Sequence, residues 1–152
     1  MGSRERVIEY LGKAGIAFEL RDFGESTKNS ALAASALGCT VAEIAKSVVF
    51  VGEMTAVVII SGDRRVDQSK LSRAAGERVR IAGPDEVRER TGFPIGGVPP
   101  FPHRREVHVF PDSSLTRFGH VWAAAGTPNS VFRIGTLDLL RLVGSGPQEL
   151  AE

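Results

Sequence analysis

Two apolar runs rich in β-branched residues lie on either side of a short turn in the first half of the chain. The runs cover residues 48–51 and 55–60, and Gly52-Glu53 stands between them. Apolar runs of this length, separated by so short a turn, are typical of paired strands that are buried in a core. The sequence therefore predicts a buried β-hairpin over residues 48–60.

Helical and strand patterns alternate on both sides of this hairpin. A capping-box match from Thr40 to Glu43 predicts a further helical turn, which would place Lys46 at the junction between that turn and the first hairpin strand. Helices are also expected at 5–14, from an N-cap at Ser30 to Gly38, at 67–75, at 85–90 and after an N-cap at Thr136, and strands at 16–23, 79–82, 106–110, 121–124 and 131–134. The pattern predicts a single α+β domain over residues 1–152, with one curved, mostly antiparallel mixed sheet of about six or seven strands and flanking helices.

Composition narrows the classes of protein that the chain can belong to. The 152 residues carry a formal net charge of +1, so a nucleic-acid contact would have to come from a local basic patch. A single cysteine, Cys39, excludes an internal disulfide framework and fits a reducing compartment. The first residues contain no apolar signal-peptide run, and no apolar stretch is long enough to span a membrane. We expect a cytoplasmic protein without a membrane partner.

Common catalytic motifs do not occur in the sequence. It contains no nucleophile elbow, phosphate-binding loop, zinc-protease motif or paired cysteine motif. The histidines at 103, 108 and 120 lack the spacing of metal ligands, and no base partner can be named for Cys39. No metal site and no cofactor are predicted, and Cys39 is expected to be an idle thiol.

Residues 91–102, with the sequence TGFPIGGVPPFP, form an unusual segment. They hold too many glycines and prolines for a helix or a ladder strand, yet they are too apolar for an ordinary solvated loop. The segment is either a rigid connection packed on the core or a pocket wall in which Gly96 and Gly97 let a ligand approach bare backbone. On the second interpretation, Gly97→Ala should impair function more than folding.

Two groups of cations have equally open interpretations. Lys46, one of only four lysines, is either a surface cation with a buried stem or a group that holds a phosphate or a developing oxyanion. His103, Arg104 and Arg105 follow the Gly/Pro segment and form either a solvated turn or a contact for backbone phosphates.

Three stretches together resemble the YbaK/ProX family of editing domains associated with prolyl-tRNA synthetase. They are Lys46 in AKSVVF, the DQSK sequence of residues 67–70 before a helix, and TGFPIGGVPPF, in an element order that agrees over nearly the whole chain. The resemblance implies hydrolysis of mischarged aminoacyl-tRNA, such as Ala-tRNA(Pro) or Cys-tRNA(Pro), without metal or organic cofactor. It also implies the acceptor end of tRNA as partner, and leaves a synthetase partner and the oligomeric state open.

The resemblance assigns roles to individual residues. Lys46 matches the lysine on which the family's activity depends, Gly96 and Gly97 match its pocket glycines, and Gly126 matches a glycine near the strand that completes the pocket. Relatives that act on cysteine have a serine and an aspartate where this chain has Ala124 and Val131, which puts cysteine specificity in doubt. Polar contacts in that region are expected instead from Asn129 and Ser130.

The mechanism implied by these residues needs no protein nucleophile. We expect Lys46 to bind the terminal phosphate or the scissile carbonyl, the Gly96-Gly97 backbone to orient the aminoacyl group, and the neighbouring ribose hydroxyl to assist the attacking water. Two alternatives remain at this stage: a non-catalytic module of the same fold that binds aminoacyl-tRNA or a synthetase, and a binder or hydrolase of small nucleotide-like esters.

Overall fold

The computed structural model describes residues 2–24 and 29–152. Within that part of the chain, the helices are α1 (Ser3–Ala14), α2 (Ser30–Leu37), α3 (Gln68–Ala75), α4 (Pro84–Thr91) and α5 (Thr136–Val143), with short 3₁₀ helices η1 (Val41–Glu43) and η2 (Ser113–Arg117). The strands are β1 (Phe18–Asp22), β2 (Ile44–Val51), β3 (Thr55–Ser61), β4 (Arg80–Ile81), β5 (His108–Pro111), β6 (His120–Ala124) and β7 (Ser130–Gly135).

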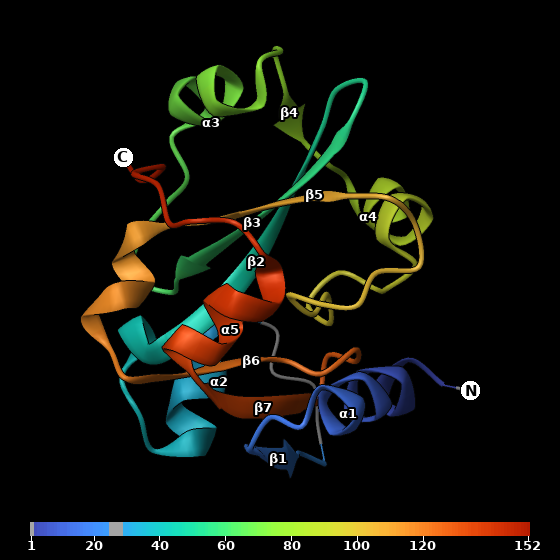
Figure 1. Ribbon diagram of the computed structural model, residues 1–152, viewed down its shortest axis with the longest axis vertical. Coiled ribbons are helices and arrows are strands. Elements are labelled where there is room, and N and C mark those ends of the chain that lie inside the picture. The colour runs from blue at the N-terminus through green and yellow to red at the C-terminus, as the bar shows by residue number, and fades with distance from the viewer. Residues whose placement is uncertain (1, 25–28) are drawn as a thin grey trace.

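All seven strands join one mixed sheet in the order β1-β7-β6-β2-β3-β5, and β4 pairs with β2 off this path. The β1–β7, β6–β7, β2–β3 and β2–β4 pairs are antiparallel, whereas β2–β6 and β3–β5 are parallel. In Figure 1, α3 and β4 lie at one end of the molecule and α1, β1 and β7 at the other. The predicted α+β class and the mostly antiparallel mixed sheet are confirmed.

The predicted hairpin is the β2–β3 pair at the centre of this sheet. Its register runs from Ala45 opposite Ser61 to Val51 opposite Thr55, and every residue of β3 is buried. Alternate residues of β3 enter two apolar clusters on opposite faces of the sheet. One cluster packs under α1 and α5, and the other under α3 and the C-terminal residues. Burial on both faces explains why this hairpin has an apolar rather than an alternating sequence.

The predicted starts of β2, α2 and α5 were wrong. The capping box at Thr40 is formed, but it supports only the 3₁₀ turn η1, and β2 begins at Ile44, four residues before the predicted strand. Lys46 therefore lies inside β2. The N-cap of α2 is Asn29, whose Oδ1 accepts a hydrogen bond from a backbone N–H, rather than Ser30. Thr136 is the first residue of α5 instead of its N-cap, because its hydroxyl donates to the carbonyl of Phe118.

Candidate functional site

The centre of the sheet opens between β2 and β6. These strands pair over two positions, Ile44 with Trp122 and Ala45 with Ala123. Gly96 and Val98 of the Gly/Pro segment line a cavity together with residues of both strands. A cavity therefore forms where the parallel ladder stops.

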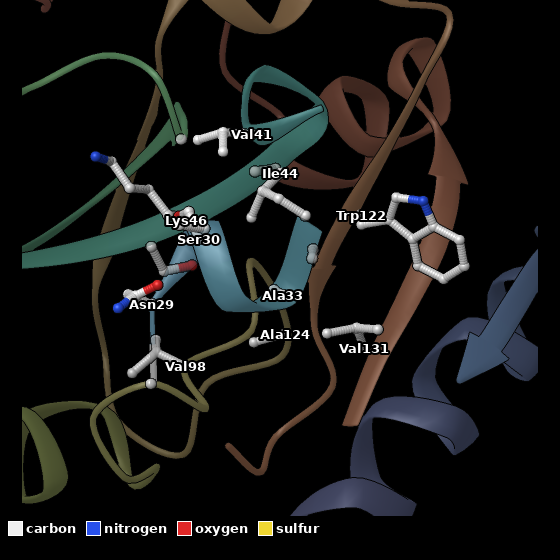
Figure 2. A pocket seen from close by; sticks show the side chains of 16 residues that line it. Asn29, Ser30, Ala33, Val41, Ile44, Lys46, Val98, Trp122, Ala124 and Val131 are labelled. Atoms are coloured by element: carbon white, nitrogen blue, oxygen red, sulfur yellow. The ribbon is translucent and has the colours of Figure 1, made fainter. Parts of the chain in front are cut away.

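This cavity has a volume of about 470 Å³. Figure 2 shows Lys46 on one side of the cavity and Trp122 and Val131 on the other. Its walls come from α2, η1, β2, β6, β7 and the Gly/Pro segment, and the lining residues are Asn29, Ser30, Ala31, Ala33, Val41, Ile44, Ala45, Lys46, Ser47, Gly62, Gly96, Val98, Trp122, Ala123, Ala124 and Val131. A mostly apolar wall with a few polar groups is the usual composition of a small-molecule site.

Lys46 brings a positive charge to this cavity. It lies opposite Ile60 in the ladder, is half-buried, and has no carboxylate within ion-pair distance in residues 2–24 and 29–152. Burial lowers the pKa of the Lys46 ammonium, the charge of Arg65 lowers it further, and the charge of Asp63 opposes both. A partly desolvated cation without a paired anion is suited to bind a phosphate or a polarised carbonyl oxygen.

Ser47 presents polar groups that the sequence analysis did not single out. The carbonyl of Ile44 accepts from Gly62 on the β3 side of β2, and the carbonyl of Val49 accepts from Ala82 on the opposite side. Backbone groups alternate in direction along a strand, so those of Ser47 point to the same side as those of Val49. That side is the gap left by β6. The Ser47 hydroxyl is also buried and has no hydrogen-bond partner within the described part of the chain.

Gly96 and Gly97 are each needed for a different reason: the first for its backbone conformation, the second for a close approach of two backbone segments. Gly96 has a φ of 82°, a left-handed conformation that favours glycine, and it lines the cavity. Gly97 donates its N–H to the carbonyl of Pro94, and a Cβ on it would lie only 2.8 Å from the carbonyl carbon of Thr127. The structure thus brings Gly96 to the same cavity as Lys46 and places Gly97 against the turn that follows β6.

Gly126, Asn129 and Ser130 lie outside the lining of this cavity. A Cβ on Gly126 would meet the carbonyl oxygen of Ser3, at the start of α1, at 2.6 Å. Asn129 donates from its side chain to the carbonyl of Phe23, and the buried Ser130 hydroxyl contacts that of Thr127. These residues hold the β6–β7 turn, whose neighbours Ala124 and Val131 do line the cavity.

His103, Arg104 and Arg105 are also absent from the cavity lining. The Nε2–H of His103 donates to the carbonyl of Pro99 at 2.9 Å, and burial lowers the pKa of the imidazole. The side chain of Arg104 packs against Gly92 at the end of α4, while Arg105 borders a separate depression. The structure thus separates this cluster from Lys46.

Several lining residues were missed because their positions depend on tertiary structure. Asn29, Ser30 and Ala33 reach the cavity through the packing of α2, and Trp122 through the pairing of β6 with β2. The only available signal was that Trp122 is the single tryptophan of the chain. Over the described ranges, no group of histidines, cysteines or carboxylates could hold a metal ion, and no helix is long and apolar enough to cross a membrane.

The fold and the cavity define a class of protein, and comparison with known proteins gives that class. The model of the aminoacyl-tRNA editing domain matches residues 24–142. The chain therefore belongs to the aminoacyl-tRNA editing domain family, as the sequence resemblance predicted.

Particular relatives place the chain within this family. It is 36% identical over 123 residues to the uncharacterised protein YwhH of Bacillus subtilis (strain 168), covering 80% of this chain and 78% of YwhH. It is 33% identical over 88 residues to the multifunctional Ser/Thr-tRNA deacylase ProXp-y of Escherichia coli (strain K12), covering 57% of this chain and 53% of that relative. The chain thus spans about half the length of the curated deacylase.

Solved structures agree with the fold over the whole chain. A crystal structure of a candidate trans-editing enzyme for prolyl-tRNA synthetase superposes with a TM-score of 0.91 at 40% identity, covering 100% of this chain and 98% of the other. The hypothetical protein APE2540 superposes with a TM-score of 0.91 at 28% identity, covering 97% of this chain and 99% of the other.

Proposed function

We propose that the protein is an aminoacyl-tRNA deacylase that hydrolyses the ester bond of mischarged tRNA in the cytoplasm. The observation that carries the proposal is the half-buried ammonium of Lys46, which has no ion-pair partner among residues 2–24 and 29–152, at one side of a cavity walled by Gly96. Family membership supports the same reaction class, because the matching model describes an editing domain and one relative is a Ser/Thr-tRNA deacylase.

In the proposed reaction, water attacks the carbonyl carbon of the ester. The bond from that carbon to the ribose oxygen breaks, the amino acid leaves as a carboxylate with release of a proton, and the ribose oxygen leaves as a hydroxyl. Lys46 stabilises the developing negative charge on the carbonyl oxygen or holds the terminal phosphate, and the Gly96-Gly97 backbone orients the aminoacyl group. The neighbouring ribose hydroxyl positions the water, so no protein base is required.

Ser47 adds a second polar contribution to this proposal. Its N–H and C=O point into the gap beside β6, and its buried hydroxyl has no partner among the described residues. These groups are suited to hold the α-amino group, the attacking water or the carbonyl oxygen of the substrate. Binding of substrate would satisfy a hydroxyl that is otherwise buried without a hydrogen bond.

The lining favours a small apolar aminoacyl group. One part of the wall is formed by Ala33, Ala124, Val131 and Trp122. The indole N–H of Trp122 is the one hydrogen-bonding group among these four side chains. Alanine is therefore the first substrate to test. Serine and threonine form the second class, because Ser47 can bond a substrate hydroxyl and because the Escherichia coli relative is a Ser/Thr-tRNA deacylase.

A panel of mischarged tRNAs tests the proposal directly. Deacylation of tRNA(Pro) carrying alanine, cysteine, serine, threonine or proline should be measured with the parental protein and with Lys46→Ala. We expect hydrolysis of the small amino acids, little of proline, and none by the variant. Retention of the parental rate by folded Lys46→Ala would exclude the mechanism.

The same panel tests a second candidate function, a non-catalytic aminoacyl-tRNA-binding or synthetase-binding module. The apolar side chains of Ala124 and Val131, at positions where relatives that act on cysteine have polar residues, favour it. Binding of every charged tRNA without turnover would select the module.

A further inference from the structure

The turn after β3 brings arginines to the edge of the Lys46 cavity. The last residue of β3, Ser61, pairs with Ala45, so the chain that follows begins beside Lys46. Gly62 lines the cavity, and Arg64 and Arg65 come directly afterwards. We call the four cations Lys46, Arg64, Arg65 and Arg117 the basic rim.

A single carboxylate, Asp63, interrupts the basic rim, and it is already engaged. Arg117 donates to both oxygens of Asp63 at 2.8 and 3.1 Å, and the Nε of Arg64 lies 3.8 Å from the same carboxylate. Accordingly, the pKa of the Asp63 carboxyl is lowered, chiefly by its hydrogen bonds from Arg117. Asp63 thus compensates Arg64 and Arg117, with a further contribution from the charge of Asp112 on Arg117, and it forms no ion pair with Lys46 or Arg65.

Arg65 is the cation that no partner explains. Its side chain is exposed, and within the described ranges it makes no ion pair; its backbone carbonyl accepts from Glu152. Its charge lowers the pKa of the Lys46 ammonium, so the two cations repel each other across the mouth of the cavity. Two neighbouring cations without a shared anion are an arrangement that an incoming anion would stabilise.

Two cations of the basic rim, Arg64 and Arg117, also line the adjoining depression, where Lys70 adds a positive charge and Asp112 and Glu149 add two carboxylates. In the described ranges, Lys46 and Arg65 are the rim cations that make no ion pair. The walls of the cavity that lie across from Lys46 are largely apolar. An anion that reaches into the cavity therefore meets positive charge on one side of the entrance.

We infer that the basic rim binds the phosphodiester groups of the single-stranded 3′ end of the RNA whose terminal ester enters the cavity. The inference rests on the proposed deacylase function and extends it, because it names the surface that holds the RNA. It also moves the phosphate contact away from Arg104 and Arg105, which the structure separates from the cavity. Arg65 is the central contact, since it is exposed and has no other partner in the described chain.

Binding of a fluorescent acceptor-stem minihelix that ends in CCA tests this inference without requiring turnover. Anisotropy titrations at several salt concentrations should compare the parental protein with Arg64→Gln, Arg65→Gln and the double variant. We expect each single substitution to weaken binding about threefold to tenfold at low salt, and to reduce the salt slope by about 0.7 for each phosphate that is no longer neutralised. Arg141→Gln is the matched control, since that arginine lies on α5 and pairs with Asp138; it should bind as the parental protein does.

A second substrate separates failure of the inference from failure of the proposed function. Alanyl adenosine carries the ester but no phosphodiester, so at a pH well below the titration of Lys46 the rim variants should lose activity on the charged minihelix by a much larger factor than on this small ester. Parental binding and an unchanged salt slope in the double variant would overturn the inference, as would weaker binding found only in Arg105→Gln. If neither ester is hydrolysed, the deacylase proposal fails, and the anisotropy data still decide whether the rim binds RNA.

Discussion

Replacing Gly97 with alanine adds a single methyl group between two backbone segments that already touch. The new Cβ would lie 2.8, 2.9 and 3.0 Å from the carbonyl carbon, Cα and N of Thr127. Carbon atoms in ordinary contact are about 3.5–4.0 Å apart, so the segments must separate by roughly 0.7 Å or more. Since backbone cannot rotate out of the way as a flexible side chain does, we expect a cost of about 1–3 kcal/mol, the usual range for overpacking.

The loss of stability is measured as a lower Tm in thermal unfolding, and the displacement of the segment as a lower rate of hydrolysis. For a chain of this length, 1 kcal/mol corresponds to about 2–4 °C in Tm, which gives an expected decrease of about 2–12 °C for Gly97→Ala. Hydrolysis of alanyl-tRNA should also fall, because the displaced segment carries Gly96 on the cavity wall. The expectation from sequence was that Gly97→Ala would impair function more than folding, and the contact with Thr127 adds an expected loss of stability to it.

Two further glycines serve as matched controls. Gly12 lies inside α1 with no atom within 4 Å of its ideal Cβ, so Gly12→Ala should raise stability by about 0.5–1 kcal/mol. Gly96→Ala tests conformation rather than space: its Cβ would meet only Pro128 at 3.8 Å, but its φ of 82° costs a non-glycine residue about 1–2 kcal/mol. If Gly97→Ala unfolded at the parental temperature and hydrolysed at the parental rate, the reasoning from its contact with Thr127 would be refuted.

Five other substitutions test individual side chains of the cavity, its rim and the core. Lys46→Ala should abolish hydrolysis without lowering Tm, because a cation whose pKa is lowered by burial does not stabilise the fold; a large drop in Tm would contradict this. After subtraction of uncatalysed hydrolysis, the rate should fall as pH rises and Lys46 loses its proton, and the midpoint of this fall should lie at a lower pH than the usual pKa of a lysine. Arg65→Gln removes a neighbouring positive charge, so it should move this midpoint to higher pH. Ser47→Ala should lower turnover about threefold to tenfold. Ser61→Ala should leave turnover unchanged, because it removes a buried hydroxyl that lies outside the cavity lining and has no partner in the described ranges. Equal effects of the two substitutions would exclude a contact between Ser47 and the substrate. Asp112→Asn should reduce the free energy of unfolding in urea by about 1–3 kcal/mol, because the buried carboxylate accepts two backbone N–H groups and an amide cannot accept from both with its two atoms.

The sequence was sufficient for the elements whose pattern is local. The hairpin of β2 and β3 could be predicted because both faces of its strands are buried, and the left-handed glycines at 15, 38 and 76 end helices at the positions that the pattern indicated. The start of β2 could not be predicted, since Ile44 and Ala45 become strand residues through pairing with β6, far along the chain, and with Ser61 at the end of β3 and Gly62 directly after it. Local capping signals at Thr40 could not reveal that competing interaction.

The candidate site divides in the same way. Lys46 and Gly96, predicted from sequence, lie on one cavity, and the predicted role of each remains to be tested. Asn129 and Ser130 were expected to contact substrate because they are polar and near Val131, but strand alternation and the hydrogen bonds of the turn direct them elsewhere. Arg65 and Ser47 were not predicted from the sequence. The role proposed for Arg65 depends on a charge without an ion-pair partner in the described chain, and that of Ser47 depends on a part of β2 that β6 does not pair.

The two-position pairing between β2 and β6 makes the width of the cavity a property of the main chain. Changing a wall side chain such as Val131 can redistribute the space inside, but the separation of the two strands is fixed by ladder hydrogen bonds on their outer sides, to β3 and to β7. Substrate range should therefore be easy to shift among amino acids of similar size and hard to extend to larger ones. We therefore expect single substitutions in the wall to exchange the specificity of the proposed deacylase, while the sheet sets its upper size limit.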